Sequence, residues 1–378
     1  TQFALNVSKV GTGTVTSNPA GIDCGATCSA NFNSGTPVTL SAAAGTGFSF
    51  TGWSGSGCSG TGTCPVTMTE ARSVTATFTA IPKSRGDVNG DGKSDLFWRT
   101  EAPGTGLSWW TMNGNQTVST NYHDVGPEWQ IADVGDLDGD GKADLVWRRP
   151  SDGASYLWLL DGFAFKGFAD LGILDPATWS LAGIADLDGN GRDDVVWRAS
   201  DGTVYGWLMN GGTIASQGVI VSPGAQWIIA ALADMDGNGK ADIVFRNVND
   251  GGVFIYFMNG LAIASGTFVG IVDPAAWTIA GAADFSGDGK ADILWRHITG
   301  DTWVWIMNGG AFVSAGGIGN PGVAWSVRAI GDYDGDGKVD LVWRHTDGTT
   351  YLWKMNGAAV SAFQPLLNPG GTWQVVAP

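Results

Sequence analysis

Six short segments of this sequence place oxygen-bearing side chains at fixed positions around glycine, a pattern suited to binding a hard cation. In residues 136–144, aspartate occupies positions 1, 3, 5 and 9, Gly141 at position 6 allows a sharp turn, and Lys142 at position 7 offers its carbonyl oxygen. Ca²⁺ takes roughly six to eight oxygen ligands in proteins. Carboxylates packed this closely repel one another unless a cation lies between them. The segment therefore predicts a calcium-binding loop.

The other five copies replace aspartate only by asparagine or serine at the coordinating positions, so an oxygen is always retained. The copies begin at residues 87, 136, 186, 234, 284 and 332. One copy is compatible with an ordinary acidic turn, but six copies spaced 48–50 residues apart predict six structural Ca²⁺ ions. The predicted ligands, with position 7 contributing a backbone carbonyl, are Asp87, Asn89, Asp91, Lys93, Asp95, Asp136, Asp138, Asp140, Lys142, Asp144, Asp186, Asp188, Asn190, Arg192, Asp194, Asp234, Asp236, Asn238, Lys240, Asp242, Asp284, Ser286, Asp288, Lys290, Asp292, Asp332, Asp334, Asp336, Lys338 and Asp340.

The residues after each loop predict a β-strand rather than a helix. An EF-hand needs a glutamate at position 12, where this chain has tryptophan or phenylalanine. Runs such as Leu145–Arg148 are β-branched and aromatic, as strands are. Each repeat then holds a second aromatic strand ending in Asn-Gly or Asp-Gly, a looser third strand, and a strand opened by tryptophan, such as Trp277–Gly281. Four short strands per repeat are typical of a propeller blade, and the small residues of the tryptophan-opened strand favour a place nearest the central axis.

These loops and strands resemble the FG-GAP/VCBS-type calcium repeats of integrin α-subunit propellers and of many secreted bacterial proteins, with Trp-Arg in place of Ala-Pro at the strand end. The resemblance implies a calcium-binding β-propeller. The first repeat lacks a tryptophan-opened strand before Asp87, and the chain ends with such a strand, Trp373–Val376, that no loop follows. We expect this C-terminal strand to complete the first blade. The predicted fold is all-β, with a six-bladed calcium-binding β-propeller over residues 86–378.

Residues 1–80 predict a separate, small β-rich module, followed by a short linker at 81–85. Gly11–Val15, Pro19–Cys24, Phe50–Trp53 and Val74–Phe78 resemble the divergent internalin B-repeat modules of bacterial surface proteins, which implies display rather than chemistry. All four cysteines lie here, in spacings that suit disulfides better than zinc. Three pairings are possible, and we favour the local pairs Cys24–Cys28 and Cys58–Cys64. Disulfides and calcium both indicate a secreted or cell-surface protein.

The composition excludes some partners. The formal charge of −16 would fall to about −4 with six bound Ca²⁺ ions, and no basic stripe for nucleic acid is present. No apolar run reaches the roughly 20 residues of a membrane span. We therefore expect an extracellular glycan or a surface protein as the partner.

An aromatic residue followed by arginine recurs after every loop and is the candidate ligand-binding feature. An aromatic face beside a fork of donors suits a sugar ring. The alternative is that the aromatic ring fills the interface between blades and the arginine stacks on it. The candidate residues, together with Phe245, are Trp98, Arg99, Trp147, Arg148, Trp197, Arg198, Arg246, Trp295, Arg296, Trp343 and Arg344.

Catalysis is not predicted. His297 and His345 occupy a repeat position where other copies carry unrelated residues, which indicates a solvated turn. The unassigned acids Glu101, Asp124, Glu128, Asp273 and Asp301 could form a glycosidase pair only at a separation that sequence does not reveal. We expect an adhesion or lectin-like glycan-binding module; a structural subunit of an extracellular assembly and a polysaccharide-active enzyme are the alternatives.

Overall fold

The computed structural model describes residues 1–45, 48–80, 83–101 and 103–376, and the chain divides into two compact units, Thr1–Pro82 and Lys83–Pro378. Residues 81 and 82 of the predicted linker, and residues 377 and 378 at the end of the predicted propeller, lie outside the described residues. Within those described ranges the chain forms strands, turns and loops and no α-helix. The predicted all-β class is therefore confirmed.

The first unit packs two sheets around one apolar core. The larger sheet has the order β3-β1-β7-β5, in which β1 and β7 run parallel, and the smaller has the order β2-β4-β6. Alternation buries Leu5 and Val7 of β1 against Val74 and Ala76 of β7. The strands are β1 (Gln2–Val10), β2 (Gly13–Asn18), β3 (Ser29–Asn33), β4 (Pro37–Ala44), β5 (Phe48–Ser54), β6 (Cys64–Thr67) and β7 (Arg72–Ala80).

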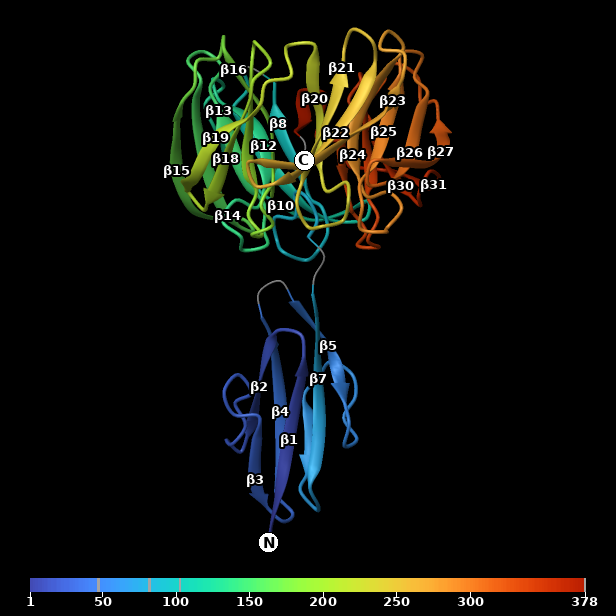
Figure 1. Ribbon diagram of the computed structural model, residues 1–378. Helices are drawn as coiled ribbons and strands as arrows, with labels where there is room; N and C mark the ends of the chain where they lie inside the picture. Colours follow the sequence, from blue (N-terminus) through green and yellow to red (C-terminus); the bar gives the residue numbers. More distant parts are fainter. Residues whose placement is uncertain (46–47, 81–82, 102, 377–378) are drawn as a thin grey trace. The chain divides into compact units, whose positions relative to one another are not determined.

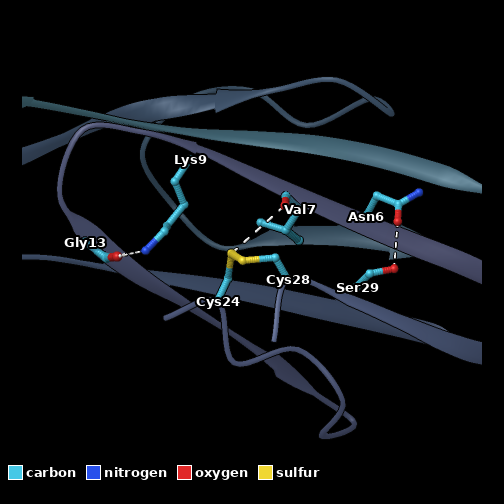
Figure 2. The surroundings of a disulfide bond; sticks show 7 residues. All are labelled: Asn6, Val7, Lys9, Gly13, Cys24, Cys28 and Ser29. Atoms are coloured by element: carbon cyan, nitrogen blue, oxygen red, sulfur yellow. Dashed lines mark hydrogen bonds between the residues drawn. A yellow bond between two sulfur atoms is a disulfide. The ribbon is translucent and has the colours of Figure 1, made fainter. Parts of the chain in front are cut away.

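Both favoured disulfides, Cys24–Cys28 and Cys58–Cys64, are present. The first closes the loop between β2 and β3, and Figure 2 shows it beside β1, with Cys24 Sγ 4.0 Å from the carbonyl oxygen of Val7. Ser29, next to Cys28, donates to Asn6 Oδ1 at 2.7 Å, so β3 is tied to β1 directly after the bridge. The disulfide thus holds a polar strand that has little apolar surface of its own.

The second unit consists of repeated four-stranded antiparallel sheets, which Figure 1 shows side by side in sequence order from green to orange. Five of them take their strands consecutively along the chain, and they are β12 (Gln130–Gly135), β13 (Asp144–Arg148), β14 (Ala154–Asp161) and β15 (Ala164–Ile173); β16 (Trp179–Ala185), β17 (Asp194–Ala199), β18 (Val204–Asn210) and β19 (Thr213–Val221); β20 (Trp227–Ala233), β21 (Asp242–Asn247), β22 (Gly252–Asn259) and β23 (Ala262–Ile271); β24 (Trp277–Ala283), β25 (Asp292–His297), β26 (Thr302–Asn308) and β27 (Ala311–Gly319); β28 (Trp325–Gly331), β29 (Asp340–His345), β30 (Thr350–Met355) and β31 (Val360–Pro365).

The remaining sheet combines the two ends of the unit. It contains β8 (Leu96–Thr100), β9 (Gly106–Asn113), β10 (Gln116–Thr120) and β32 (Trp373–Val376), with the two-residue β11 (His123–Asp124) paired to β9. Trp373 lies opposite Thr100 and Val376 opposite Phe97 in antiparallel register. The predicted pairing of the C-terminal strand with the strand after the first loop is therefore confirmed.

Adjacent sheets pack through apolar clusters to which both contribute. Trp147 of β13 packs with Phe97 and Leu107 of the first sheet. Val342 and Leu352 of the last sheet pack in the same way with Trp98 of the first. The second strand of each sheet is apolar on both faces because it is covered by a neighbouring sheet on each side, as the almost continuous burial of β13 and β29 shows.

Candidate metal centres

The six acidic loops, numbered loop 1 (87–95), loop 2 (136–144), loop 3 (186–194), loop 4 (234–242), loop 5 (284–292) and loop 6 (332–340), share one local hydrogen-bond pattern. In loop 2, Asp136 accepts the backbone N–H of Gly139 at 2.7 Å and that of Gly141 at 3.0 Å. Both glycines have a positive φ, 81° and 84°, which glycine adopts without steric cost. The position-1 aspartate accepts from positions 4 and 6 in every loop, so this spacing folds the turn.

Carboxylates converge in four of the loops. In loop 2, oxygens of Asp136, Asp138 and Asp144 lie within 4.8 Å of one another. The other convergent sets are Asp186, Asp188 and Asp194; Asp234, Asp236 and Asp242; and Asp332, Asp334 and Asp336. Loops 1 and 5 have as many aspartates at positions 1, 3, 5 and 9 as loops 3 and 4, but with Asn89 and Ser286 at position 3 their carboxylates stand at positions 1, 5 and 9. Oxygen donors at this separation fit a hard divalent cation.

The position-9 aspartate has a second role that the sequence did not reveal. Asp144 is fully buried, and its two oxygens accept the backbone N–H groups of Leu137 at 3.0 Å and Leu160 at 2.9 Å. Asp144 therefore connects loop 2 to the end of β14. All six copies do the same. Burial raises the pKa of Asp144 to about 8 and that of Asp95 to about 8, because the charged form loses its hydration.

Lysine at position 7, predicted to offer only its carbonyl, also uses its side chain. Lys93 donates to Asn113 Oδ1 at 2.9 Å and Lys338 to Asn356 Oδ1 at 2.7 Å, which connects each loop to the hairpin of its own sheet. In loop 3 the equivalent Arg192 donates instead to the carbonyl oxygen of Asp138 in loop 2, at 3.1 Å.

Neighbouring loops are joined by backbone hydrogen bonds that repeat around the unit. The carbonyl oxygen of the position-1 aspartate accepts the N–H at position 8 of the following loop, as Asp87 does from Ala143 at 2.6 Å. The remaining donor and acceptor pairs are Asp193 and Asp136, Ala241 and Asp186, Ala291 and Asp234, Val339 and Asp284, and Ser94 and Asp332. Displacing one loop would therefore strain the next.

Loop 2 is also contacted by lysines that the other loops lack at matching positions. Lys166 of β15 lies 2.6 Å from Asp138 Oδ2 and 2.8 Å from Asp140 Oδ2, and Lys83 donates to Asp136 Oδ2 at 2.9 Å. Sequence analysis missed both residues. The sequence could have indicated both lysines because each interrupts the repeat pattern. Lys166 stands in an outer strand, and Lys83 precedes the first repeat.

The structure corrects the ligand-binding interpretation of the aromatic–arginine pairs. The tryptophans are 0–2% exposed because they fill the interface between sheets, so their faces are not available to a sugar. Arg344 donates to the carbonyl oxygens of Gly348 and Gly370 at 2.9 and 3.0 Å. Five guanidinium groups lie over the ring of the following sheet at 4.8–5.9 Å, in the pairs Arg99 and Trp147, Arg148 and Trp197, Arg246 and Trp295, Arg296 and Trp343, and Arg344 and Trp98. The sixth arginine is Arg198, and the sheet that follows it has Phe245 at the tryptophan position. Arg198 donates to the carbonyl oxygen of Gly224 at 2.9 Å.

Two of the histidines and two of the unassigned acids make polar contacts at turns and strand ends. His297 Nδ1 lies 2.5 Å from Thr299 Oγ1, and Asp347 Oδ1 lies 2.9 Å from His345 Nδ1. Among the unassigned acids, Asp124 accepts from Thr105 at 2.7 Å, and Glu101 from Gln374. These contacts stabilise turns and strand ends.

Comparison with known families and structures agrees with this geometry. The sequence matches the FG-GAP-like repeat family over residues 87–147, 136–197, 186–245, 234–295 and 284–343, more than half of the chain. The chain belongs to the FG-GAP-like repeat family. Residues 3–82 match the divergent InlB B-repeat domain. Both resemblances seen in the sequence are therefore confirmed.

Chains of two solved structures are similar to this chain at low identity. A chain in the crystal structure of a nidogen/laminin complex is 14% identical with a TM-score of 0.52, covering 76% of this chain and 97% of that chain. A chain in the outer coat vertex of COPII on membranes is 11% identical with a TM-score of 0.45, covering 74% and 76%. At such identity the first likeness concerns the fold alone. No curated protein sequence matches the chain, and no helix among the described residues is long and apolar enough to cross a membrane.

Proposed function

We propose that this chain is an extracellular, calcium-stabilised adhesion module that binds a surface protein or a glycan and performs no catalysis. The observation that carries this proposal is the set of convergent aspartates, as in loop 2, repeated along a family of FG-GAP-like repeats. The local disulfides and the InlB-like module support an extracellular place. Residues 1–80 would act as a spacer, 81–85 as the linker and 86–378 as the binding unit.

The binding unit is proposed to be a closed propeller of six blades. Two observations support closure: β32 pairs with β8, and apolar residues of the last sheet pack on those of the first. A closed ring leaves no free inner sheet edge, which removes a site of unwanted strand pairing. It also presents rigid loops on two faces, which suits recognition without chemistry.

Each loop is proposed to hold one Ca²⁺ ion, with the predicted oxygens at positions 1, 3, 5, 7 and 9 as its ligands. A bound cation offsets the repulsion within sets such as Asp332, Asp334 and Asp336. It would also compensate the buried charge of aspartates such as Asp144, whose side chain is fully buried. Calcium therefore stabilises the framework and does not contact the partner.

The test combines ion counting with a binding assay. Metal-free chain titrated with calcium in a calorimeter should bind six ions, and Asp144→Asn should bind five. The matched control Asp152→Asn, a partly exposed residue that pairs with Arg149 outside the loops, should still bind six. Immobilised chain should then retain glycans or surface proteins from an array in calcium and release them in chelator. Calcium binding without any retained partner would reject the adhesion role, and no calcium binding would reject the metal sites.

A further inference from the structure

The tryptophan-opened strands β12, β16, β20, β24 and β28 share a β-bulge at their fourth residue, counted from the tryptophan position. In β28 the pairing shifts between Val327 and Ala329, so Arg328 has no partner opposite it on β29. A bulge re-aims the side chain of the extra residue, and bulges are frequent beside binding sites. The bulged residue is alanine in the other four strands, at Ala132, Ala182, Ala230 and Ala280. Arg328 therefore replaces the repeated alanine at a position whose side chain the bulge redirects.

Arg328 lines two cavities. One, of about 270 Å³, lies between β12, β28 and β32 and includes Asp133 and Val376. The other, of about 230 Å³, is lined by polar groups, among them Ser326, Thr346 and Gln374. Successive tryptophan-opened strands contact one another, from β12 to β32, so the first cavity lies where these strands come together. Among the described residues, the guanidinium of Arg328 makes one hydrogen bond, from Nη2 to the Val375 carbonyl oxygen at 3.0 Å.

The cavity of about 230 Å³ is positively charged in a chain of net charge −16. Its described lining contains Arg328, Arg344 and His345 and no carboxylate. Arg344 is engaged with backbone carbonyls over the ring of Trp98, as described above. Burial, followed by the charge of Arg328, lowers the pKa of Arg344. Two like charges at one cavity favour an anionic ligand.

The carboxylates nearby are already engaged. Asp133, across the first cavity, binds Arg85 at 2.7 Å and the N–H of Ile184 at 2.9 Å. Glu101 accepts from Gln374 Nε2 at 2.7 Å, and Asp347 lies against His345. Of the cations around the cavity, Arg328 retains donors for an incoming carboxylate, and Arg is the side chain best shaped to bind one bidentately.

We propose that the cavity beside Arg328 binds the carboxylate of an acidic sugar, a hexuronate unit of a surface glycan. Arg328 pairs with the carboxylate, and Thr346 hydrogen-bonds a ring hydroxyl. Other ring hydroxyls donate to Ser326 Oγ and Gln374 Oε1, because these two side chains already donate to the Arg344 carbonyl oxygen and to Glu101. These extra polar groups favour a hydroxyl-rich ring over an aspartate or glutamate side chain, which would use the arginine alone. The inference rests on the proposed adhesion role and names the ligand class for it.

The test uses the full, calcium-loaded chain and calorimetry with free sugars and acids. D-galacturonate should bind, whereas D-galactose, which differs by the carboxylate alone, should bind at least tenfold more weakly. N-acetylglutamate and inorganic phosphate, added separately, probe a peptide carboxylate and a generic anion. Tighter binding of either one than of galacturonate would overturn the sugar assignment, and absence of binding by galacturonate would overturn the site.

Variants decide whether Arg328 is responsible. Arg328→Ala should weaken galacturonate binding at least tenfold while leaving the melting temperature within a few degrees, because four sister strands carry alanine at this bulge. Arg149→Ala removes another arginine, one that pairs with Asp152 outside the cavity, and should bind as the parent chain does. Equal loss in both variants, or none in Arg328→Ala, would reject the proposal. Calcium counts on the same samples report separately on the proposed function.

Discussion

The backbone N–H of Ser94 in loop 1 donates to the carbonyl oxygen of Asp332 in loop 6 over 2.7 Å. Residues 238 positions apart thereby repeat the contact that every other pair of successive loops makes. The contact joins the first repeat to the last at the level of the acidic loops, as β32 joins them at the level of the sheet. Stability of the unit should therefore depend on its C-terminal strand as strongly as on any internal strand.

Val375→Asp tests this dependence. Val375 is fully buried between the first and last sheets, so an unpaired carboxylate there should cost more than about 4 kcal/mol of unfolding free energy and promote aggregation. The matched control Val313→Asp changes an exposed residue of β27 and should cost less than about 0.5 kcal/mol. Urea denaturation in calcium measures both. Similar midpoints for the two variants would mean that the C-terminal strand does not hold the unit together.

Removal of calcium should destabilise the repeats strongly. Each site held at 100 times its Kd contributes about 2.7 kcal/mol by mass action, and several sites together rival a typical domain stability of about 5–15 kcal/mol. Differential scanning calorimetry should show a transition that moves down by more than about 10 °C in chelator, while a transition of the disulfide-bonded first unit stays in place. An unchanged scan would refute the structural role of the ion.

The metal-free chain should lose stability as the pH rises. Asp95 and Asp144 have a folded pKa of about 8 against an ordinary value of 3.8, because burial disfavours the charge. The folded state therefore binds more protons than the unfolded state between these values, and the unfolding free energy falls from pH 4 toward pH 8. Urea midpoints at pH 5 and pH 8 in metal-free buffer test the sign. A higher midpoint at pH 8 contradicts it, and Asp144→Asn should flatten the dependence.

Besides the charge that it contributes to the cavity, Arg344 should matter for stability. Arg344→Ala removes its hydrogen bonds to Gly348 and Gly370 and empties the buried space over the Trp98 ring, so we expect a loss of about 2–4 kcal/mol. Arg149→Ala, whose parent side chain is partly exposed and pairs with Asp152, should lose less than about 1 kcal/mol. Equal losses of unfolding free energy in chemical denaturation would show that the Arg344 guanidinium over the Trp98 ring adds no stability beyond that of an exposed ion pair.

The sequence determined the acidic loops and the repeated sheets and favoured the disulfides that the structure has, because each of these features is local in the chain. Position 1 of a loop bonds to positions 4 and 6 within nine residues, and Cys24 reaches Cys28 within five. The C-terminal pairing of β32 with β8 could also be predicted, since a strand was missing at one end of the repeats and spare at the other. The strands β3 and β6 could not be, because β3 is mostly polar and β6 is short, and both depend on pairing and on a nearby disulfide.

Only the tertiary structure decided the role of the aromatic–arginine pairs. Whether Trp147 faces solvent or Arg99 depends on a sheet that comes from about 50 residues away in the chain, and burial by that neighbour converts a plausible sugar platform into core. The second role of Asp144 was also decided by the tertiary structure, because its Oδ1 accepts the N–H of Leu160 on the neighbouring strand. Arg328 is one arginine among many in the sequence, and it becomes a candidate site because a bulge turns it toward cavities that three strands form together. Contacts of this kind are set by packing between distant segments, which residue spacing does not encode.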